Sequence, residues 1–187
     1  MEREFQKHLT ANQWIFGSEY SELLDKRHLT RDENQDLIFR RTVDGYVEII
    51  ELKRPLPGVD LFIEDASHQS LYPRSDVTEA VGQVLHYIEE IEANRHAIMV
   101  KDQLDTNKIR AKIIVGRSGA ERQLAALRSL NGHLDRIEIL TFDQLLGIGR
   151  QVLSTLHEVL PPLDEDVVLD TSYPQQTRRT CQGRCPS

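Results

Sequence analysis

The stretch QDLIFRRTVDGYVEIIELKRP, residues 35–55, constrains the fold more than any other part of the chain. Two runs rich in β-forming residues, at about 35–42 and 46–53, flank Asp44-Gly45, a dipeptide typical of tight hairpin turns. Pro55 ends the second run because proline cannot donate a hydrogen bond to a β-ladder. The stretch therefore predicts two antiparallel strands joined by a short turn.

Three charged side chains are brought together by this hairpin. Side chains alternate between the two faces of a strand, so Glu51 and Lys53 emerge on the same face at the end of the second strand. Because the strands are antiparallel, Asp36 at the start of the first strand lies beside the end of the second. We expect Asp36, Glu51 and Lys53 to gather at one corner of the sheet.

Two carboxylates and a lysine at one corner have a chemical use. Hard divalent cations such as Mg²⁺ bind one or two carboxylates together with water and substrate phosphate. A bound cation can activate water and stabilise the charge that builds on a scissile phosphate, and a nearby lysine can orient that water. The competing interpretation is a surface salt bridge at a strand end, worth about 0–1 kcal/mol.

The remaining periodicity indicates an alternation of helices and strands. Apolar residues recurring at three and four predict the helices, and short apolar runs predict the strands. The expected helices are 2–11, 76–94, 120–131 and 143–160, with a short helix in 18–27. The expected further strands are 96–100, 111–117 and 136–142. Residues 55–75 are expected to form a long loop, with a short strand or helix within it as the alternative. This alternation predicts an α/β domain over residues 1–160, followed by a disordered tail over 161–187.

Composition excludes some classes and locations. The formal net charge of -7 means that any nucleic-acid contact needs a local basic patch. The charged N-terminus is not a signal peptide, and no apolar run approaches the roughly 18 residues that a membrane span needs. Cys181 and Cys185 are the two cysteines, both in the last seven residues. A chain body without cysteine fits the reducing cytoplasm, and we interpret this pair as incidental.

A further motif lies on the expected helix 76–94. Gln83 and Tyr87 have the spacing Q-x-x-x-Y. Together with Asp36 and Glu51-Leu52-Lys53, they make the chain resemble the PD-(D/E)xK nuclease superfamily. The order of the segments EREFQKHLTANQWIFG, ELKRP and AVGQVLHY is similar to the nuclease domain of Shedu anti-phage defence proteins. The resemblance covers residues 2–95 and implies a restriction-endonuclease-like fold, with a central mixed β-sheet flanked by helices.

The resemblance also implies roles for individual residues. Asp36 and Glu51 would bind Mg²⁺ or Mn²⁺, together with the carbonyl of Leu52. Lys53 would position or activate the attacking water, and Gln83 would support the site from its helix. A glutamate of the first helix would join the site, with Glu4 preferred over Glu2. Residue 35 is Gln where the superfamily motif has proline. For Tyr87, half-buried packing is the competing interpretation.

DNA is the substrate that the resemblance implies, bound by a homo-oligomer such as a tetramer. Candidate phosphate contacts are Arg40, Arg41, Arg54 and Lys101, which could equally be solvated charges of an acidic protein. The alternative from another functional class is a catalytically silent PD-(D/E)xK-like module that binds nucleic acid or mediates oligomerisation. A restriction or repair nuclease of the same fold is a third hypothesis, which differs in substrate and not in chemistry.

Overall fold

The structure is a computed structural model that describes residues 2–25, 28–30 and 34–159. Its helical elements are α1 (Glu2–Ala11), the 3-10 segment η1 (Gln13–Glu19), α2 (Ser75–Ala93), α3 (Arg95–Asp102), α4 (Glu121–Asn131) and α5 (Phe142–Val159). Its strands are β1 (Tyr20–Leu23), β2 (Leu37–Arg41), β3 (Val47–Leu52), β4 (Phe62–Asp65), β5 (Ser70–Pro73), β6 (Arg110–Ile114) and β7 (Ile137–Leu140). No helix within these residues is long and apolar enough to cross a membrane.

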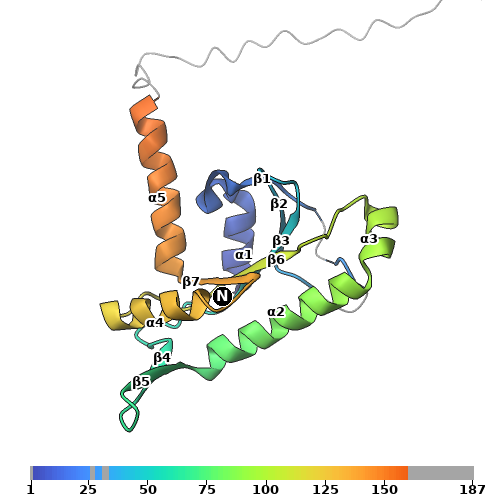
Figure 1. Cartoon of the computed structure of the whole chain (residues 1–187). Coiled ribbons are helices and arrows are strands. Elements are labelled where there is room, and N and C mark those ends of the chain that lie inside the picture. The colour runs from blue at the N-terminus through green and yellow to red at the C-terminus, as the bar shows by residue number, and fades with distance from the viewer. Residues whose placement is uncertain (1, 26–27, 31–33, 160–187) are drawn as a thin grey trace, which may run out of the picture.

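A mixed sheet forms the centre of the molecule (Figure 1). Within the described residues it has the strand order β1-β2-β3-β6-β7. The first three strands pair antiparallel, whereas β3, β6 and β7 pair parallel. The helix α2 lies between β3 and β6 in the sequence, as a parallel connection requires. The predicted fold class, α/β with a central mixed sheet flanked by helices, is confirmed.

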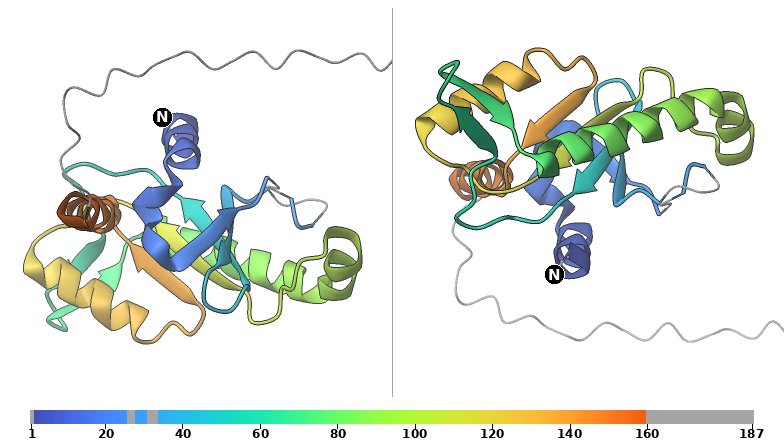
Figure 2. Two further views of the ribbon diagram at one scale, coloured as in Figure 1. Left: turned by 90° about the horizontal axis from the view of Figure 1, so that it is seen from above. Right: turned by 90° about the horizontal axis from the view of Figure 1, so that it is seen from below.

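Helices cover both faces of this sheet. On one face, Val47 and Ile49 of β3 pack in a core with Val84 and Ile88 of α2. On the other face, Ile50 and its neighbours pack in a second core with residues of α1, η1 and α5. Figure 1 and the two turned views in Figure 2 show α2 on one side of the sheet and α1 and α5 on the other. The alternation predicted for this strand is therefore observed.

The central hairpin has the predicted turn. Gly45 has φ of 71°, a backbone conformation that favours glycine. Its amide donates to the carbonyl of Arg41 at 3.1 Å, and the amide of Arg41 donates to the carbonyl of Tyr46 at 2.9 Å. The Asp44 carboxylate accepts from the amide of Tyr46 at 3.1 Å. These local bonds fix the register, in which Leu37 lies opposite Ile50.

Two predicted elements are wrong. Residues 18–27 were expected to contain a short helix, but Tyr20–Leu23 form strand β1, which pairs with the open side of β2. Residues 96–100 were expected to form a buried strand, but they lie in helix α3, where Ile98 is the buried side chain. Both runs are short, and in both cases the neighbouring structure decided the conformation. The segment of β1 pairs with the side of β2 that β3 leaves open, and the segment of α3 continues the helical conformation at the end of α2.

The expected loop 55–75 contains a small hairpin, β4–β5, which pairs Phe62 with Pro73 and Asp65 with Ser70. Figure 1 shows this hairpin projecting from the body beside the start of α2. The other strands and helices of the domain were predicted to within a few residues. The tail predicted for 161–187, including Cys181 and Cys185, lies outside the described residues and stays a prediction.

Two amide side chains of α4 hold the edges of both sheets. The Gln123 side chain accepts from the amide of Phe62 at 2.9 Å and donates to its carbonyl at 3.1 Å. The Asn131 side chain bonds Ile139 in the same way, at 2.9 and 2.8 Å. The carbonyls of Arg136 and Leu140 accept hydrogen bonds from the amides of Ala111 in β6 and of Val115 just after it. The backbone amide and carbonyl of Ile139 therefore point away from β6, to the outer edge of β7. Each amide thus takes the place of a neighbouring strand.

Candidate active site

The three predicted charged residues do meet at one corner. Asp36 lies directly before β2, Glu51 is the second-to-last residue of β3, and Lys53 directly follows β3. Leu37, the next residue, pairs with Ile50, so the same register continued by one residue sets Asp36 opposite Glu51. The Asp36 carboxylate accepts a hydrogen bond of 2.9 Å from the amide of Leu52. This bond holds the start of β2 against the end of β3.

The ammonium group of Lys53 joins the sheet to helix α2. It donates to the Glu51 carboxylate at 2.8 Å and to the side-chain oxygen of Gln83 at 2.5 Å. The amide nitrogen of Gln83 in turn donates to the hydroxyl of Tyr87, one helical turn along α2. Glu51 is buried and Lys53 is 25% exposed, so this charged pair is largely removed from water. A buried charge needs such partners, because an unpaired one would be costly.

Tyr87 combines the two interpretations that the sequence left open. Its ring is buried in the core between the sheet and α2. Its hydroxyl group accepts the hydrogen bond from Gln83. Packing therefore fixes the ring, and the fixed hydroxyl orients the amide that holds Lys53.

Helix α1 also touches the site, through a residue that the sequence did not single out. The Gln6 side chain donates a hydrogen bond of 2.6 Å to the carbonyl of Asp36. Glu4, the predicted first-helix residue, lies two positions earlier and is exposed. The side chain of Glu2 lies outside the description. A role for Glu4 stays a prediction, and no spacing signal in α1 pointed to Gln6.

A small cavity opens beside Lys53. It has a volume of about 240 Å³ and lies between the end of β3 and the first turns of α2. Its lining consists of Lys53, Arg54, Leu56, Asp76, Glu79, Ala80, Gln83 and Val115. Asp76 and Glu79 were missed by the sequence analysis. Their spacing of seven and four residues before Gln83 places them on one helical face, and this periodicity could have found them.

The four predicted phosphate-binding residues are dispersed. Arg54 lines the cavity next to Lys53. Arg40 and Arg41 lie at the opposite end of β2 from Asp36, where they pair with Glu22 at 3.0 Å and Asp44 at 3.4 Å. Lys101 is on α3, beyond the far end of α2. The structure therefore brings one of the four, Arg54, to the corner, and a role in DNA binding stays a prediction for all of them.

The corner can offer oxygen donors to a cation. The Asp36 and Glu51 carboxylates and the Leu52 carbonyl are hard oxygen donors, which suit Mg²⁺ and Mn²⁺. In the part of the chain that the structure describes, no group of three or more His, Cys, Asp or Glu residues could hold a metal ion. A cation at this corner would therefore need water or substrate oxygens to complete its shell, as Mg²⁺ usually does. The residues present fit such an ion.

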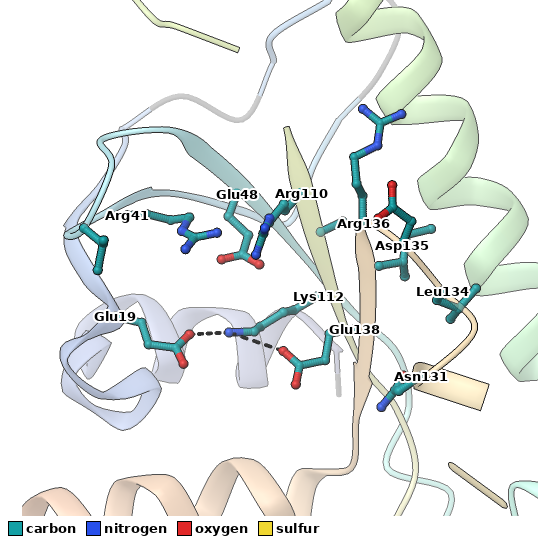
Figure 3. A pocket seen from close by; sticks show the side chains of 13 residues that line it. Glu19, Arg41, Glu48, Arg110, Lys112, Asn131, Leu134, Asp135, Arg136 and Glu138 are labelled. Carbon is teal, nitrogen blue, oxygen red and sulfur yellow. Dashed lines mark hydrogen bonds and ion pairs between the residues drawn. The ribbon is translucent and has the colours of Figure 1, made fainter. Parts of the chain in front are cut away.

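A second hollow lies at the other end of the parallel strands and on the opposite sheet face (Figure 3). Its volume is about 480 Å³. Its floor includes Glu48 and Lys112. Glu48 accepts a hydrogen bond of 2.9 Å from Tyr20, which lies outside the lining, and Lys112 bonds Glu19 and lies 3.5 Å from Glu138. Figure 3 shows the chain of contacts from Glu19 through Lys112 to Glu138. The floor charges are paired with one another, which indicates a structural role.

Burial and nearby charges shift the pKa values of Glu48 and Lys112 on this floor and of the adjacent Tyr20. Burial raises the pKa of Glu48 above its usual range, and the nearby Lys112 ammonium only partly offsets this. Burial alone would lower the pKa of Lys112, but the carboxylates of Glu48, Glu19 and Glu138 outweigh it and raise the pKa. Burial and then Glu48 raise the pKa of Tyr20. Lys112 and Tyr20 therefore keep their protons at neutral pH.

The hairpin, the two carboxylates and the lysine that follows them define a protein of the PD-(D/E)xK class. Comparison with known families identifies the family within this class. The chain belongs to the family described as Shedu protein SduA, C-terminal, whose model matches residues 1–146. The suspected Shedu relationship is therefore confirmed.

No curated protein matches the chain. Among solved structures, a chain in "Structure of EndoMS-dsDNA2 complex" is similar, with 13% sequence identity and a TM-score of 0.36. The match covers 75% of this chain and 44% of that one, so this chain spans less than half the length of that structure's chain.

Proposed function

We propose that this chain is a Mg²⁺- or Mn²⁺-dependent DNA endonuclease that acts in anti-phage defence. The observation that carries the proposal is the position of Lys53, held between the Glu51 carboxylate and Gln83 at the corner that Asp36 shares. Membership of the Shedu family supports the defence role. We further propose that the protein works as a homo-oligomer, such as a tetramer, in the cytoplasm.

Asp36, Glu51 and the Leu52 carbonyl would hold the cation in this mechanism. When bound, the cation supplies a more acidic water and offsets the negative charge that builds on the scissile phosphate. Lys53 directs its ammonium protons at the water or at a phosphate oxygen, and so orients the attack. Gln83 and Tyr87 fix the direction of the ammonium group, because each hydrogen bond removes one of its alternative orientations.

The acidic cavity wall also has a consequence for substrate binding. Asp76 and Glu79 form the α2 wall of the cavity, whereas Lys53 and Arg54 follow β3, so the DNA backbone is repelled from α2 and attracted to the end of β3. The backbone is therefore expected to approach from the side of Asp36 and α1. In a chain with a net charge of -7, cations at the same edge of the sheet must supply the attraction.

The decisive experiment is cleavage of linear and supercoiled DNA with Mg²⁺, Mn²⁺ or EDTA. It compares the wild type with Lys53→Met, which keeps the apolar stem and removes the charge. Lys108→Met, at an exposed turn before β6, is the matched control. Metal-dependent cutting that is lost in Lys53→Met and kept in Lys108→Met would support the proposal.

The opposite outcome is equally informative. If a folded wild type neither binds Mn²⁺ nor cuts any of several DNA forms, the nuclease proposal fails. DNA binding that persists unchanged in Asp36→Ala and Glu51→Ala would then indicate a silent nucleic-acid-binding module. The mass of the protein in solution, measured by light scattering, tests the proposed assembly separately.

A further inference from the structure

Two segments that leave the sheet at the same edge stay side by side. The strands β3 and β6 are parallel neighbours, and the amide of Lys53 donates to the carbonyl of Ile114 at 2.8 Å. Beyond the strands, the amide of Gly116 donates to the carbonyl of Arg54 at 3.0 Å. Gly116 lies so close to Leu61 that an added Cβ would come within 2.5 Å of its side chain. Arg117, the next residue, therefore lies beside the segment that leaves the candidate active site.

A second route connects Arg117 to Asp36 across the other sheet face. The guanidinium of Arg117 bonds Asp143 in the first turn of α5. The adjacent Phe142 ring packs on the Phe5 ring of α1, with 5.2 Å between centroids. The residue after Phe5 is Gln6, which bonds the carbonyl of Asp36. Arg117 and Asp36 thus belong to one edge of the molecule, with α1 spanning between them.

The guanidinium of Arg117 is held firmly on one side only. Its Nε donates to the two Asp143 oxygens at 2.8 and 2.9 Å, and Nη2 lies 2.5 Å from Oδ1. Asp143 is itself fixed by the amide of Ser118 at 2.7 Å. No acceptor for Nη1 is found within residues 2–25, 28–30 and 34–159, and the Arg117 side chain is 51% exposed. The outer side of a planar guanidinium matches the oxygens of a phosphate.

We propose that Arg117 binds a DNA phosphate next to the scissile phosphate, which would lie at the cation that Asp36 and Glu51 would hold. Both phosphates belong to the DNA strand that crosses the ends of β3 and β6. This rests on the proposed function and adds a substrate-positioning residue to it. Asp143 orients the guanidinium before DNA arrives, so less side-chain freedom is lost on binding. Arg54, exposed on the adjacent segment, adds a second cation to the same edge.

The test is the salt dependence of DNA binding, which is measured by the fluorescence anisotropy of a labelled linear duplex. Ca²⁺ replaces Mg²⁺, and a gel confirms that the duplex stays intact. The variants are Arg117→Gln, Arg117→Lys and the control Arg136→Gln. Arg136 likewise pairs with a single carboxylate, that of Glu92, but it precedes β7 and so lies at the opposite end of the parallel strands from Arg117. Far-UV circular dichroism confirms that each variant is folded.

For Arg117→Gln, we expect the slope of log affinity against log salt to fall by about 0.9, and affinity near 0.1 M salt to fall roughly tenfold. Arg117→Lys should keep most of the slope because it keeps the charge, and Arg136→Gln should match the wild type. A wild type that binds DNA while Arg117→Gln binds with the same slope overturns this inference and leaves the nuclease proposal standing. A wild type that binds no DNA overturns both.

Discussion

The ammonium group of Lys53 lies 2.5 Å from the side-chain oxygen of Gln83, although the two residues are thirty positions apart and belong to different layers of the fold. The contact makes the position of a proposed catalytic charge depend on helix α2 as well as on strand β3. Because α2 packs on the sheet through a continuous apolar core, its contribution is rigid.

Gln83→Met removes the hydrogen bond to Lys53 while keeping the length of the side chain. We expect DNA cleavage to slow by about tenfold to a hundredfold, because a misdirected ammonium no longer orients the attack. Single-turnover cleavage rates under saturating metal measure the effect. Gln151→Met, at an exposed position of α5, is the matched control. An unchanged rate in Gln83→Met would show that Lys53 does not need its helix partner.

Glu51→Gln and Asp36→Asn each replace a carboxylate by an amide of the same shape. We expect Mn²⁺ affinity without DNA to fall by at least about tenfold for each, since a neutral amide is a poorer partner for a hard cation. Isothermal titration calorimetry measures it. Asp44→Asn, in the turn of the same hairpin, should bind Mn²⁺ like the wild type. Equal affinity in all four proteins would place the cation elsewhere.

Glu48→Gln removes the buried carboxylate from the floor of the second hollow. The folded-state pKa of Glu48 is raised, so the folded protein holds this proton at pH values where the unfolded chain has lost it. The stabilisation from Glu48 is therefore complete below its ordinary pKa and is lost as pH rises through the folded pKa. The variant should gain stability relative to the wild type above about pH 4.5, by at most about 1.4 kcal/mol per pH unit. Urea unfolding between pH 4 and 7 measures this, and a difference of opposite slope would contradict it.

Asn131→Ala removes two hydrogen bonds, the one that the side chain accepts from the amide of Ile139 and the one that it donates to the carbonyl of Ile139. We expect the free energy of unfolding to fall by roughly 1–3 kcal/mol, because two backbone groups of a buried residue lose their partners. Ser129→Ala, at an exposed position of the same helix, controls for the change to alanine. Urea unfolding compares the two. A loss no larger than that of Ser129→Ala would mean that water replaces the amide at this edge.

The corner formed by Asp36, Glu51 and Lys53 could be predicted because its causes are local. A turn of known type sets the hairpin register, and alternation along β3 then decides which charges share a face. The contact between Gln6 and Asp36 could not be predicted, because nothing in α1 indicates which polar side chain meets a residue thirty positions away. The same holds for Gln123 and Asn131, which look like ordinary surface amides of a helix. At β1 and α3, runs of four or five residues were too short for periodicity to decide.

The amide of Asn131 has a consequence for how copies of this protein can meet. An exposed strand edge is a template on which a second chain can add a strand. At β7 the outward amide and carbonyl of Ile139 are already bonded, so a second sheet cannot extend this one there without first displacing helix α4. Growth of the sheet from copy to copy is blocked on this side. Copies that associate through this side of the molecule must therefore meet through helices and loops.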